Sequence, residues 1–363
     1  MGVGMDAFKG AARILLVRLD NIGDVVMLSP AVRVLRRALP GARITLLASP
    51  AGAAVASLLP GLDEVLVRRA PWQDARGDMA FDPQREQAWV RDLAMRSFDA
   101  AFIFTSFSQS PFPAAYACYL AGIPVRIGQS REFGGAVLTH WVRPLADSAH
   151  QVDRNLHLLK EAGVPVRGPG LKALRLAVPT EAHARAEGML RERGVRGDFV
   201  VVAPGATCAA RRYPAERYGS VAAALQSLGR QVVVVGGPKD YATGEAVVAA
   251  APGTVSLCGH TDLAELAAVL QRARLLIAND SGPMHIADAV GCPMVVLYAG
   301  TELEEQWRPR TAPARILRRP TACAPCYRFD CPYGLECLRI APAEVVAQAR
   351  ALLGEALREV AGG

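Results

Sequence analysis

The amino-acid sequence predicts an α/β protein of two similar domains, each a parallel sheet covered by helices. Short runs of valine, leucine and isoleucine, typical of buried strands, alternate with segments of helical periodicity, and this alternation runs twice along the chain. Residues 167–179 (RGPGLKALRLAVP), with turn residues at both ends, separate the two runs. A length of 363 residues is also more typical of two domains than of one. We therefore predict two Rossmann-like domains whose parallel sheets face a cleft.

The first run opens with RILLVRL at residues 13–19, a buried-strand pattern that ends in a turn at 20–23. A helical pattern at 24–39 then ends at Pro40 and Gly41, two residues that stop helices. The other strands predicted in this half are 43–48, 64–67, 99–104 and 125–127, and the other helices are 51–59, 84–95 and 111–120. Strands that alternate with helices in this way predict right-handed β-α-β units.

The second run repeats the pattern. Its predicted strands are 199–203, 231–235, 255–257, 274–278 and 294–298, and its predicted helices are 181–193, 214–228, 241–250, 263–272 and 284–290. Residues 342–360 read as a long amphipathic helix. We expect an N-terminal domain at 1–170, a C-terminal domain at 180–340, and a final helix at 342–360 that could pack back on the N-terminal domain.

The composition is that of a globular protein, with 51% apolar and 21% charged residues. No window approaches the ~18–20 uninterrupted apolar residues of a membrane span, and the N-terminus lacks a signal-peptide pattern, so we expect a cytoplasmic location. The net charge of +7 favours phosphorylated ligands or anionic lipid, although an arginine-rich genome would produce the same charge. Motifs for nucleic-acid binding, nucleoside triphosphates and dinucleotides are absent from the sequence, so we expect no nucleic-acid partner.

Three loops in the second half follow predicted strands, where parallel sheets bind their ligands. They are residues 204–214 (PGATCAARRYP), 236–240 (GGPKD) and 279–283 (NDSGP). In the last, Asp280 or Ser281 would cap the following helix, and Gly282 leaves room for a close approach. The exposed amides of a helix N-terminus bind anions, and His285 lies one turn further on. A helix that is merely well capped would have the same sequence.

The other two loops add groups that suit a phosphorylated ligand. Arg211 and Arg212 can pair with phosphate oxygens through their forked guanidinium groups, and Thr207 lies in the same loop. Asp240 could accept hydrogen bonds from ribose hydroxyls or could cap the helix that follows it. In the first half, the loop RLDNIGD at residues 18–24 places Asp24 at a helix start, either as a helix cap or as a general base.

Four segments together resemble the ADP-heptose-dependent glycosyltransferases of family 9, the bacterial lipopolysaccharide heptosyltransferases. They are RILLVRLDNIGDVVMLSPAVRVLRRALPGARITLL, VVAPGATCAARRYPAERYGSVA, VVVVGGPKD and ANDSGPMHIADAVGCPMVVLYAGT, in that order. The tail CAPCYRFDCPYGLECLRIAPAEVV is also similar to tails of that family. The specific signal is NDSG-x-x-H combined with the N-terminal GD loop.

The resemblance implies a GT-B fold and an enzyme that needs no metal or other cofactor. It implies inverting transfer of heptose from ADP-heptose to a lipid-linked saccharide of the lipopolysaccharide inner core, at the cytoplasmic face of the inner membrane and in contact with anionic lipid. Alternatives of the same fold are a protein acceptor or another nucleotide sugar, and a third alternative is a non-enzymatic nucleotide-binding or metal-stapled interaction module.

The same resemblance implies roles for individual residues. Asp24 is the expected base. The donor-binding residues are expected to be Thr207, Arg211, Arg212, Asp240, Asp280, Ser281, Gly282 and His285. Arg211 stands where the family usually has a lysine. Candidates for contact with acidic groups of the acceptor are Arg18, Arg126 and Arg131, which could equally be solvated surface charges.

The eight cysteines fall into two groups. Cys118, Cys208, Cys258 and Cys292 are scattered through predicted elements and read as buried small residues. Cys323, Cys326, Cys331 and Cys337 lie within fifteen residues and could hold a structural zinc or iron. Related protein heptosyltransferases carry iron held by cysteines, so this tail keeps the protein-acceptor alternative open.

Overall fold

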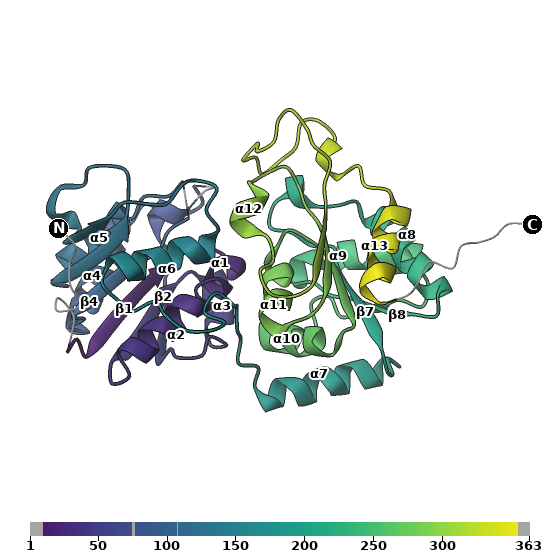
Figure 1. Ribbon diagram of the computed structural model, residues 1–363, viewed down its shortest axis with the longest axis horizontal. Helices are drawn as coiled ribbons and strands as arrows, with labels where there is room; N and C mark the ends of the chain where they lie inside the picture. The colour runs from purple at the N-terminus through teal and green to yellow at the C-terminus, as the bar shows by residue number, and fades with distance from the viewer. Residues whose placement is uncertain (1–9, 75–76, 107, 355–363) are drawn as a thin grey trace, which may run out of the picture. The chain divides into compact units, whose positions relative to one another are not determined.

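The structure, a computed structural model, describes residues 10–74, 77–106 and 108–354. The chain divides into two compact units, Met1–Ala177 and Val178–Gly363. The division falls inside the segment 167–179, the connection expected from the sequence. Each unit contains one six-stranded parallel sheet with helices on its faces (Figure 1).

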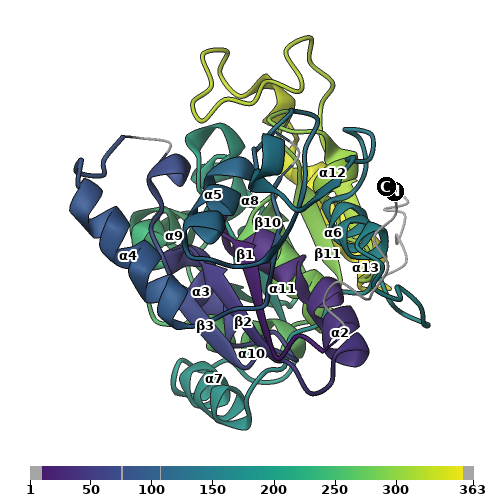
Figure 2. The ribbon, with the colours of Figure 1, turned by 90° about the vertical axis from the view of Figure 1, so that its left-hand side faces the viewer.

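The first sheet has the strand order β3-β2-β1-β4-β5-β6, and every neighbouring pair is parallel. Its strands are β1 (Arg13–Arg18), β2 (Arg43–Ala48), β3 (Glu64–Val67), β4 (Ala100–Ile103), β5 (Val125–Gln129) and β6 (His140–Val142). Helices α4 (Pro83–Met95) and α5 (Phe112–Leu120) pack together on one face, and α2 (Ser29–Ala38) and α6 (Gln151–Glu161) pack together on the other (Figure 2). Alternate side chains of β1, Leu15 and Val17, lie in the core with Leu93 of α4 and Ala115 of α5.

The helix predicted at residues 24–39 is two helices, α1 (Ile22–Val26) and α2, which meet at Met27 and Leu28. Pro30 lies in the first turn of α2, where a proline costs no hydrogen bond, whereas inside one continuous helix it would break the ladder. Asn155 of α6 donates to the Met27 carbonyl at 3.1 Å and so satisfies backbone at the break. The remaining helix of this region, α3 (Pro50–Ala56), packs on α1.

The second sheet has the order β12-β11-β10-β7-β8-β9, again with parallel neighbours. Its strands are β7 (Phe199–Ala203), β8 (Gln231–Val234), β9 (Val255–Ser256), β10 (Leu275–Asn279), β11 (Met294–Leu297) and β12 (Ala314–Leu317). Its helices are α7 (Thr180–Glu192), α8 (Ala215–Ser227), α9 (Tyr241–Ala250), α10 (Leu263–Arg272), α11 (Gly282–Val290), α12 (Glu304–Trp307) and α13 (Pro342–Leu352). Counted from β7, this is the same strand order as in the first sheet, so each unit has the doubly wound Rossmann topology.

The final helix α13 packs on the core of the second unit. Its buried residues Val345, Val346 and Ala349 lie in one core with Tyr218 and Leu225 of α8. The helix ends at Leu352, and the predicted continuation to residue 360 runs outside the described residues. Hydrophobic burial on the second sheet therefore fixes this helix.

Each sheet has one point at which the chain changes direction along it. In the first sheet this point lies between β1 and β4, and in the second between β7 and β10. The connections that leave these two strands diverge to opposite faces of the sheet, so a crevice is left at their carboxyl ends. The loops that hold Asp24, Arg211 and Asp280 follow β1, β7 and β10, and therefore begin at these two points.

Candidate functional site

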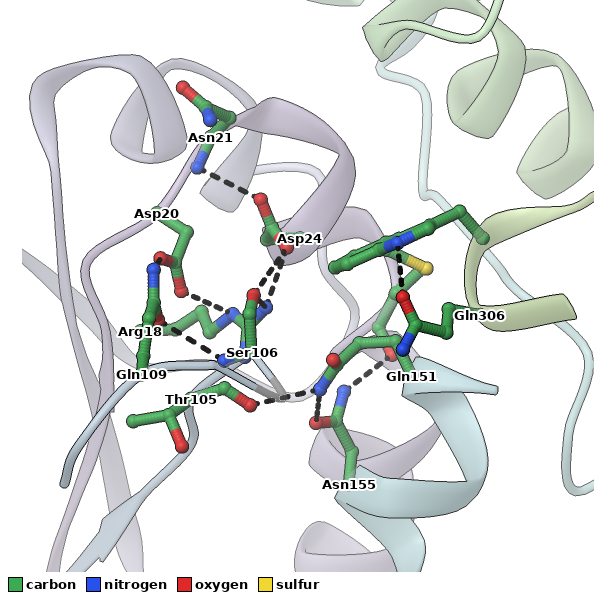
Figure 3. A network of polar contacts seen from close by, with 12 residues as sticks. Arg18, Asp20, Asn21, Asp24, Thr105, Ser106, Gln109, Gln151, Asn155 and Gln306 are labelled. Atoms are coloured by element: carbon green, nitrogen blue, oxygen red, sulfur yellow. Dashed lines mark hydrogen bonds and ion pairs between the residues drawn. The ribbon is translucent and has the colours of Figure 1, made fainter. Parts of the chain in front are cut away.

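A buried arginine, Arg18, lies at the carboxyl end of β1 and joins the loops that follow β1 and β4 (Figure 3). Its Nε lies 2.9 Å from Asp20 Oδ2, and its Nη2 donates to Asp24 Oδ1 at 2.6 Å. The same Nη2 donates to Ser106 Oγ at 3.0 Å, and Gln109 Nε2 donates to Asp20 Oδ1 at 2.6 Å. Since 0% of the Arg18 side chain is exposed, its charge is balanced inside the protein by two carboxyl groups.

Asp24 lies in the first turn of α1, three residues after the N-cap residue Asn21. Its Oδ2 accepts the Asn21 N–H at 3.1 Å, and its Oδ1 accepts from Arg18 and, at 3.4 Å, from Ser106 Oγ. The cap position that the sequence left open for Asp24 is thus filled by Asn21, and Asp24 supports it in the manner of a capping box. Because 12% of the Asp24 side chain stays exposed, a bound hydroxyl could reach its carboxylate.

The charges around Arg18 influence one another strongly. Burial raises the pKa of Asp20 to about 6; Arg18 offsets this only in part, and the negative charge of Asp24 adds to it. Burial lowers the pKa of Arg18, but Asp20 and Asp24 together raise it by more, so the guanidinium stays protonated. The crevice of the first sheet therefore contains a permanent positive charge held between two acidic groups.

Two of the three arginines expected to contact an acceptor have structural roles instead. Arg18 is buried and pairs with Asp20 and Asp24. Arg126, 7% exposed, donates to the backbone carbonyl of Val137 at 2.7 Å and to three other carbonyls nearby, which ties β5 to the segment before β6. Arg131 is exposed, and its Nη2 lies 2.9 Å from Asp147 Oδ1. Neither Arg18 nor Arg126 is a solvated surface charge, since chain geometry buries both.

A basic pocket that the sequence analysis missed lies beyond the carboxyl end of β3. It has a volume of about 290 Å³ and is lined by Val67, Arg68, Arg69, Asp78, Met79, Ala80 and Arg85. The Arg68 guanidinium pairs with Glu86 and lies 4.4 Å from the ring centre of Trp89. Arg69 is 54% exposed and pairs with Asp74 at 3.2 Å. Two adjacent arginines in a loop after a strand were a usable signal, since Arg211 and Arg212 were singled out in a similar way.

In the second unit, the side chain of Asn279 joins two loops at the end of β10. Its Oδ1 accepts the Tyr213 N–H at 3.1 Å and the Tyr218 hydroxyl at 3.0 Å, while its Nδ2 donates to the Pro204 carbonyl at 2.8 Å. The residue is fully buried. These three hydrogen bonds connect the end of β10 to the loop after β7 and to α8. Asn279 therefore holds these segments in place relative to one another.

Arg211 lies beside Asp280 at this junction. Its Nε donates to Thr301 Oγ1 at 2.9 Å and lies 3.9 Å from Asp280 Oδ2, and its Nη2 lies 2.8 Å from Glu302 Oε1. Burial raises the pKa of Asp280 to about 8; Arg211 lowers it, but the negative charge of Glu302 raises it again. One quarter of the Arg211 side chain, 24%, is exposed. The arginine is therefore a cation that a ligand from solvent can reach.

Helix α11 begins at Gly282, two residues after Asp280, the carboxyl that lies beside Arg211. Ser281 is the N-cap residue in extended conformation, but its hydroxyl donates to the Gly205 carbonyl at 3.4 Å instead of capping the helix. His285, 7% exposed, lies in the first turn of the same helix. Pro283 has no N–H, and the Met284 N–H donates to the Ser281 carbonyl at 3.0 Å. Because the N-cap side chain does not cover the helix end, the Gly282 amide can bind an anion.

The remaining donor candidates are arranged around Gly205. A methyl group at Gly205 would come within 2.4 Å of Asp240 Cγ, so the glycine allows the loops after β7 and β8 to touch. Asp240 Oδ2 accepts the Gly237 N–H at 3.0 Å and so fills the capping role left open for it. Arg212 turns to its own loop, where Nε and Nη2 both donate to the Ala206 carbonyl at 3.0 Å. Thr207 is exposed.

The four cysteines of the tail line one small cavity but do not form a metal site. All four are free thiols: Cys323 is exposed, Cys326 and Cys331 are half-buried, and Cys337 is buried. In the described part of the chain, no three cysteine, histidine or acidic side chains converge closely enough to hold a metal ion. The other four cysteines are buried, as expected.

Comparison with known proteins gives a consistent result. Residues 88–336 match the model of the family described as Glycosyltransferase family 9 (heptosyltransferase). Lipopolysaccharide heptosyltransferase 2 of Escherichia coli K12 is 26% identical over 358 residues, which are 94% of this chain and 98% of that protein.

Two solved structures share the fold. The family 9 glycosyltransferase of Veillonella parvula has a TM-score of 0.76 and 24% identity, covering 98% of this chain and 99% of its own. The E. coli heptosyltransferase WaaC with ADP-2-deoxy-2-fluoro heptose has a TM-score of 0.68 and 17% identity, covering 93% of this chain and 99% of its own.

We expect the substitution Arg18→Met to lower the free energy of unfolding by about 3–5 kcal/mol, because it leaves Asp20 and Asp24 buried without their cation. Urea unfolding followed by circular dichroism measures the effect. The control Arg43→Met removes an arginine that is 60% exposed beside Glu64, and should cost less than about 1 kcal/mol. An Arg18→Met protein as stable as the wild type would show that the three charges are not coupled.

Asp280 makes stability depend on pH. Its pKa is raised in the folded chain, from 3.8 to about 8, so the folded state holds a proton that the unfolded state releases, and stability falls as the pH rises across that window. The variant Asp280→Asn does not titrate. Its melting temperature relative to wild type should therefore be higher at pH 8 than at pH 5, by at least about 2–4 °C. The control Asp198→Asn, at a carboxyl that is 61% exposed, should show no such change. Equal differences at both pH values for Asp280→Asn would contradict the raised pKa.

Proposed function

The chain belongs to glycosyltransferase family 9, the heptosyltransferase family, and we propose that it transfers heptose from ADP-heptose to a saccharide of the lipopolysaccharide core. It is a glycosyltransferase with the GT-B fold of two Rossmann-like domains. The observation that carries the proposed donor is the pairing of Arg211 with the uncapped N-terminus of α11 at the crevice of the second sheet. The heptosyltransferase WaaC, which shares this fold, binds an ADP-heptose analogue.

The second domain is proposed to hold the donor. A diphosphate would be bound by the amides of Ser281 and Gly282 and by the Arg211 guanidinium. Asp280 and His285 flank the same helix end, and Asp240, whose loop contacts Gly205, would accept hydrogen bonds from the ribose hydroxyls. When ADP leaves, negative charge grows on its terminal phosphate, and a helix terminus with an arginine stabilises that charge without a metal. The tail cysteines have no part in this step.

The first domain is proposed to supply the base. Asp24 would accept the proton of an acceptor hydroxyl as its oxygen attacks the anomeric carbon from the side opposite to ADP. The carbon–phosphate oxygen bond breaks, ADP departs with the electron pair, and the configuration at the sugar carbon inverts. The bonds from Arg18 and the Asn21 amide support this role, because they leave the Asp24 carboxylate one orientation.

The basic pocket beyond β3 is proposed to bind an acidic group of the acceptor. Arg69 and Arg85 are partly exposed, and each would exchange its present partner, Asp74 or Glu86, for a sugar carboxylate or phosphate. A lipid-linked acceptor requires contact with a membrane surface, and the net charge of +7 favours anionic lipid. In the described ranges, no helix has the length and apolar character to cross a bilayer, so we propose peripheral contact.

Membership of a glycosyltransferase family removes the non-enzymatic alternative. The relatives that cover most of this chain are lipopolysaccharide heptosyltransferases, which favours the lipopolysaccharide core over a protein acceptor. Transfer to the lipopolysaccharide core is therefore the proposal that the observations support best.

The central test compares ADP-heptose with other nucleotide sugars, using purified protein, a defined lipopolysaccharide-core acceptor and mass spectrometry of the product. We expect transfer from ADP-heptose alone, in the presence of a chelator. The substitution Asp24→Asn should lower kcat by about 10²–10⁴-fold without weakening ADP binding, because only proton transfer is lost. The control Asp63→Asn, at the amino end of β3, should keep full activity. Full activity of Asp24→Asn would exclude this residue as the base.

The acceptor pocket makes a separate prediction. The substitution Arg69→Gln should raise the KM for the acceptor by about tenfold and leave the KM for ADP-heptose unchanged, since one charge-assisted contact to an acidic group is worth about 1.5 kcal/mol. Steady-state kinetics with each substrate varied in turn measures both constants. The exposed Arg43, beside Glu64, provides the control Arg43→Gln. If only the KM for ADP-heptose changed, Arg69 would bind the donor and not the acceptor, and the proposed acceptor pocket would be wrong.

A further inference from the structure

Arg211 is already paired with a carboxylate before any ligand is present. Its Nη2 lies 2.8 Å from Glu302 Oε1, and the two side chains are similarly exposed, 24% and 25%. The second carboxyl nearby, Asp280, lies 3.9 Å from Nε and is 3% exposed. Burial raises the pKa of Asp280, so Glu302 is the group that balances the arginine's charge at neutral pH.

The ion pair between Arg211 and Glu302 opposes the binding of a diphosphate at Arg211. An arginine neutralised by Glu302 offers little net attraction to a phosphate, and a phosphate placed at Arg211 would lie beside a second negative charge. The charged Glu302 carboxylate cannot share the guanidinium with a diphosphate without repulsion. Asp280 is fixed by burial, whereas Glu302 has a quarter of its side chain in solvent and can turn away. The group that must move is therefore Glu302.

The segment before Glu302 is held in place. Cys326 N–H donates to the Gly300 carbonyl at 2.9 Å, and Tyr327 N–H donates to the Thr301 carbonyl at 2.9 Å. Thr301 Oγ1 also accepts from Arg211 Nε at 2.9 Å. The backbone at 300–301 is thus braced by the cysteine tail, and the Glu302 side chain can exchange partners without moving the loop.

We propose that Glu302 is a specificity-determining residue that occupies the diphosphate position on Arg211 and must be displaced by the donor. The inference rests on the proposed function, since it assumes that the donor's phosphates bind at Arg211. Displacement costs the same free energy for every ligand that uses Arg211 and nothing for a ligand that does not. The residue therefore weakens binding of nucleotides through their phosphates and leaves nucleoside contacts unaffected.

The test measures binding of ADP and of adenosine to the full chain by isothermal titration calorimetry. The substitution Glu302→Gln keeps the size of the side chain and removes its charge. We expect ADP to bind up to about fivefold more tightly and adenosine to bind unchanged, in line with the loss of one partly exposed ion pair. Glu302→Asp, which keeps the charge, should return ADP affinity towards wild type. Thermal unfolding should show a melting temperature within a few degrees of wild type for both.

A matched control lies two residues away. Glu304 pairs with Arg318 at 3.6 Å, not with Arg211, so Glu304→Gln removes one negative charge from the same segment and should leave ADP affinity unchanged. If Glu302→Gln binds ADP no more tightly than wild type, or if Glu304→Gln has the same effect as Glu302→Gln, the inference is wrong. If the wild type binds ADP no better than adenosine, the proposed donor site is wrong, and the inference falls with it.

Discussion

The parallel pairing of β1 with β4, and of β7 with β10, is the constraint on which both crevices depend. In each sheet the chain leaves these two strands in opposite directions, so their carboxyl ends cannot be covered by a connecting loop. Backbone amides and polar side chains at those ends must then be satisfied by neighbouring loops or by a ligand. The first sheet satisfies them with Arg18 and its carboxyls, and the second with the amide of Asn279. The candidate functional residues therefore lie at the strand ends that no connecting loop covers.

The two domains treat a buried positive charge differently, and the difference matches their proposed tasks. Arg18 is completely enclosed and acts on Asp24, so it positions a carboxylate without meeting a substrate. Arg211 is partly open to solvent and faces an uncapped helix end, so it can exchange an internal partner for an external one. An enclosed ion pair resists change because separating it exposes two charges to a poor solvent. A partly solvated pair costs little to open. Rigid positioning and reversible binding thus follow from the depth at which each arginine lies.

The sequence predicted most of the fold, because strands such as Phe199–Ala203 are continuous apolar runs between turn residues. The prediction failed where the buried side chains are polar or where an element is short. Helix α6 was missed because Gln151, Arg154 and Asn155 lie on its buried face, and β12 was missed because its half-buried ARIL run is too short and mixed to stand out. The break before α2 depends on a tertiary bend at Met27 that local preference does not specify.

The candidate site was predictable to the same degree. The loops of Asp24, Arg211 and Asp280 follow from strand ends and turn residues, but the partners of each charge do not. That Arg126 donates to backbone carbonyls, and that Glu302 lies on Arg211, depends on contacts between segments far apart in the chain.

The cysteine tail has a consequence for how such chains diverge. The backbone of the tail donates hydrogen bonds to the carbonyls of Gly300 and Thr301, and Thr301 in turn accepts a hydrogen bond from Arg211. The tail therefore supports a residue that contacts Arg211. An insertion or deletion between residues 318 and 340 would shift that support and with it the depth of the guanidinium. The length of the tail therefore bears on how Arg211 is held, even though none of its thiols needs to meet the nucleotide.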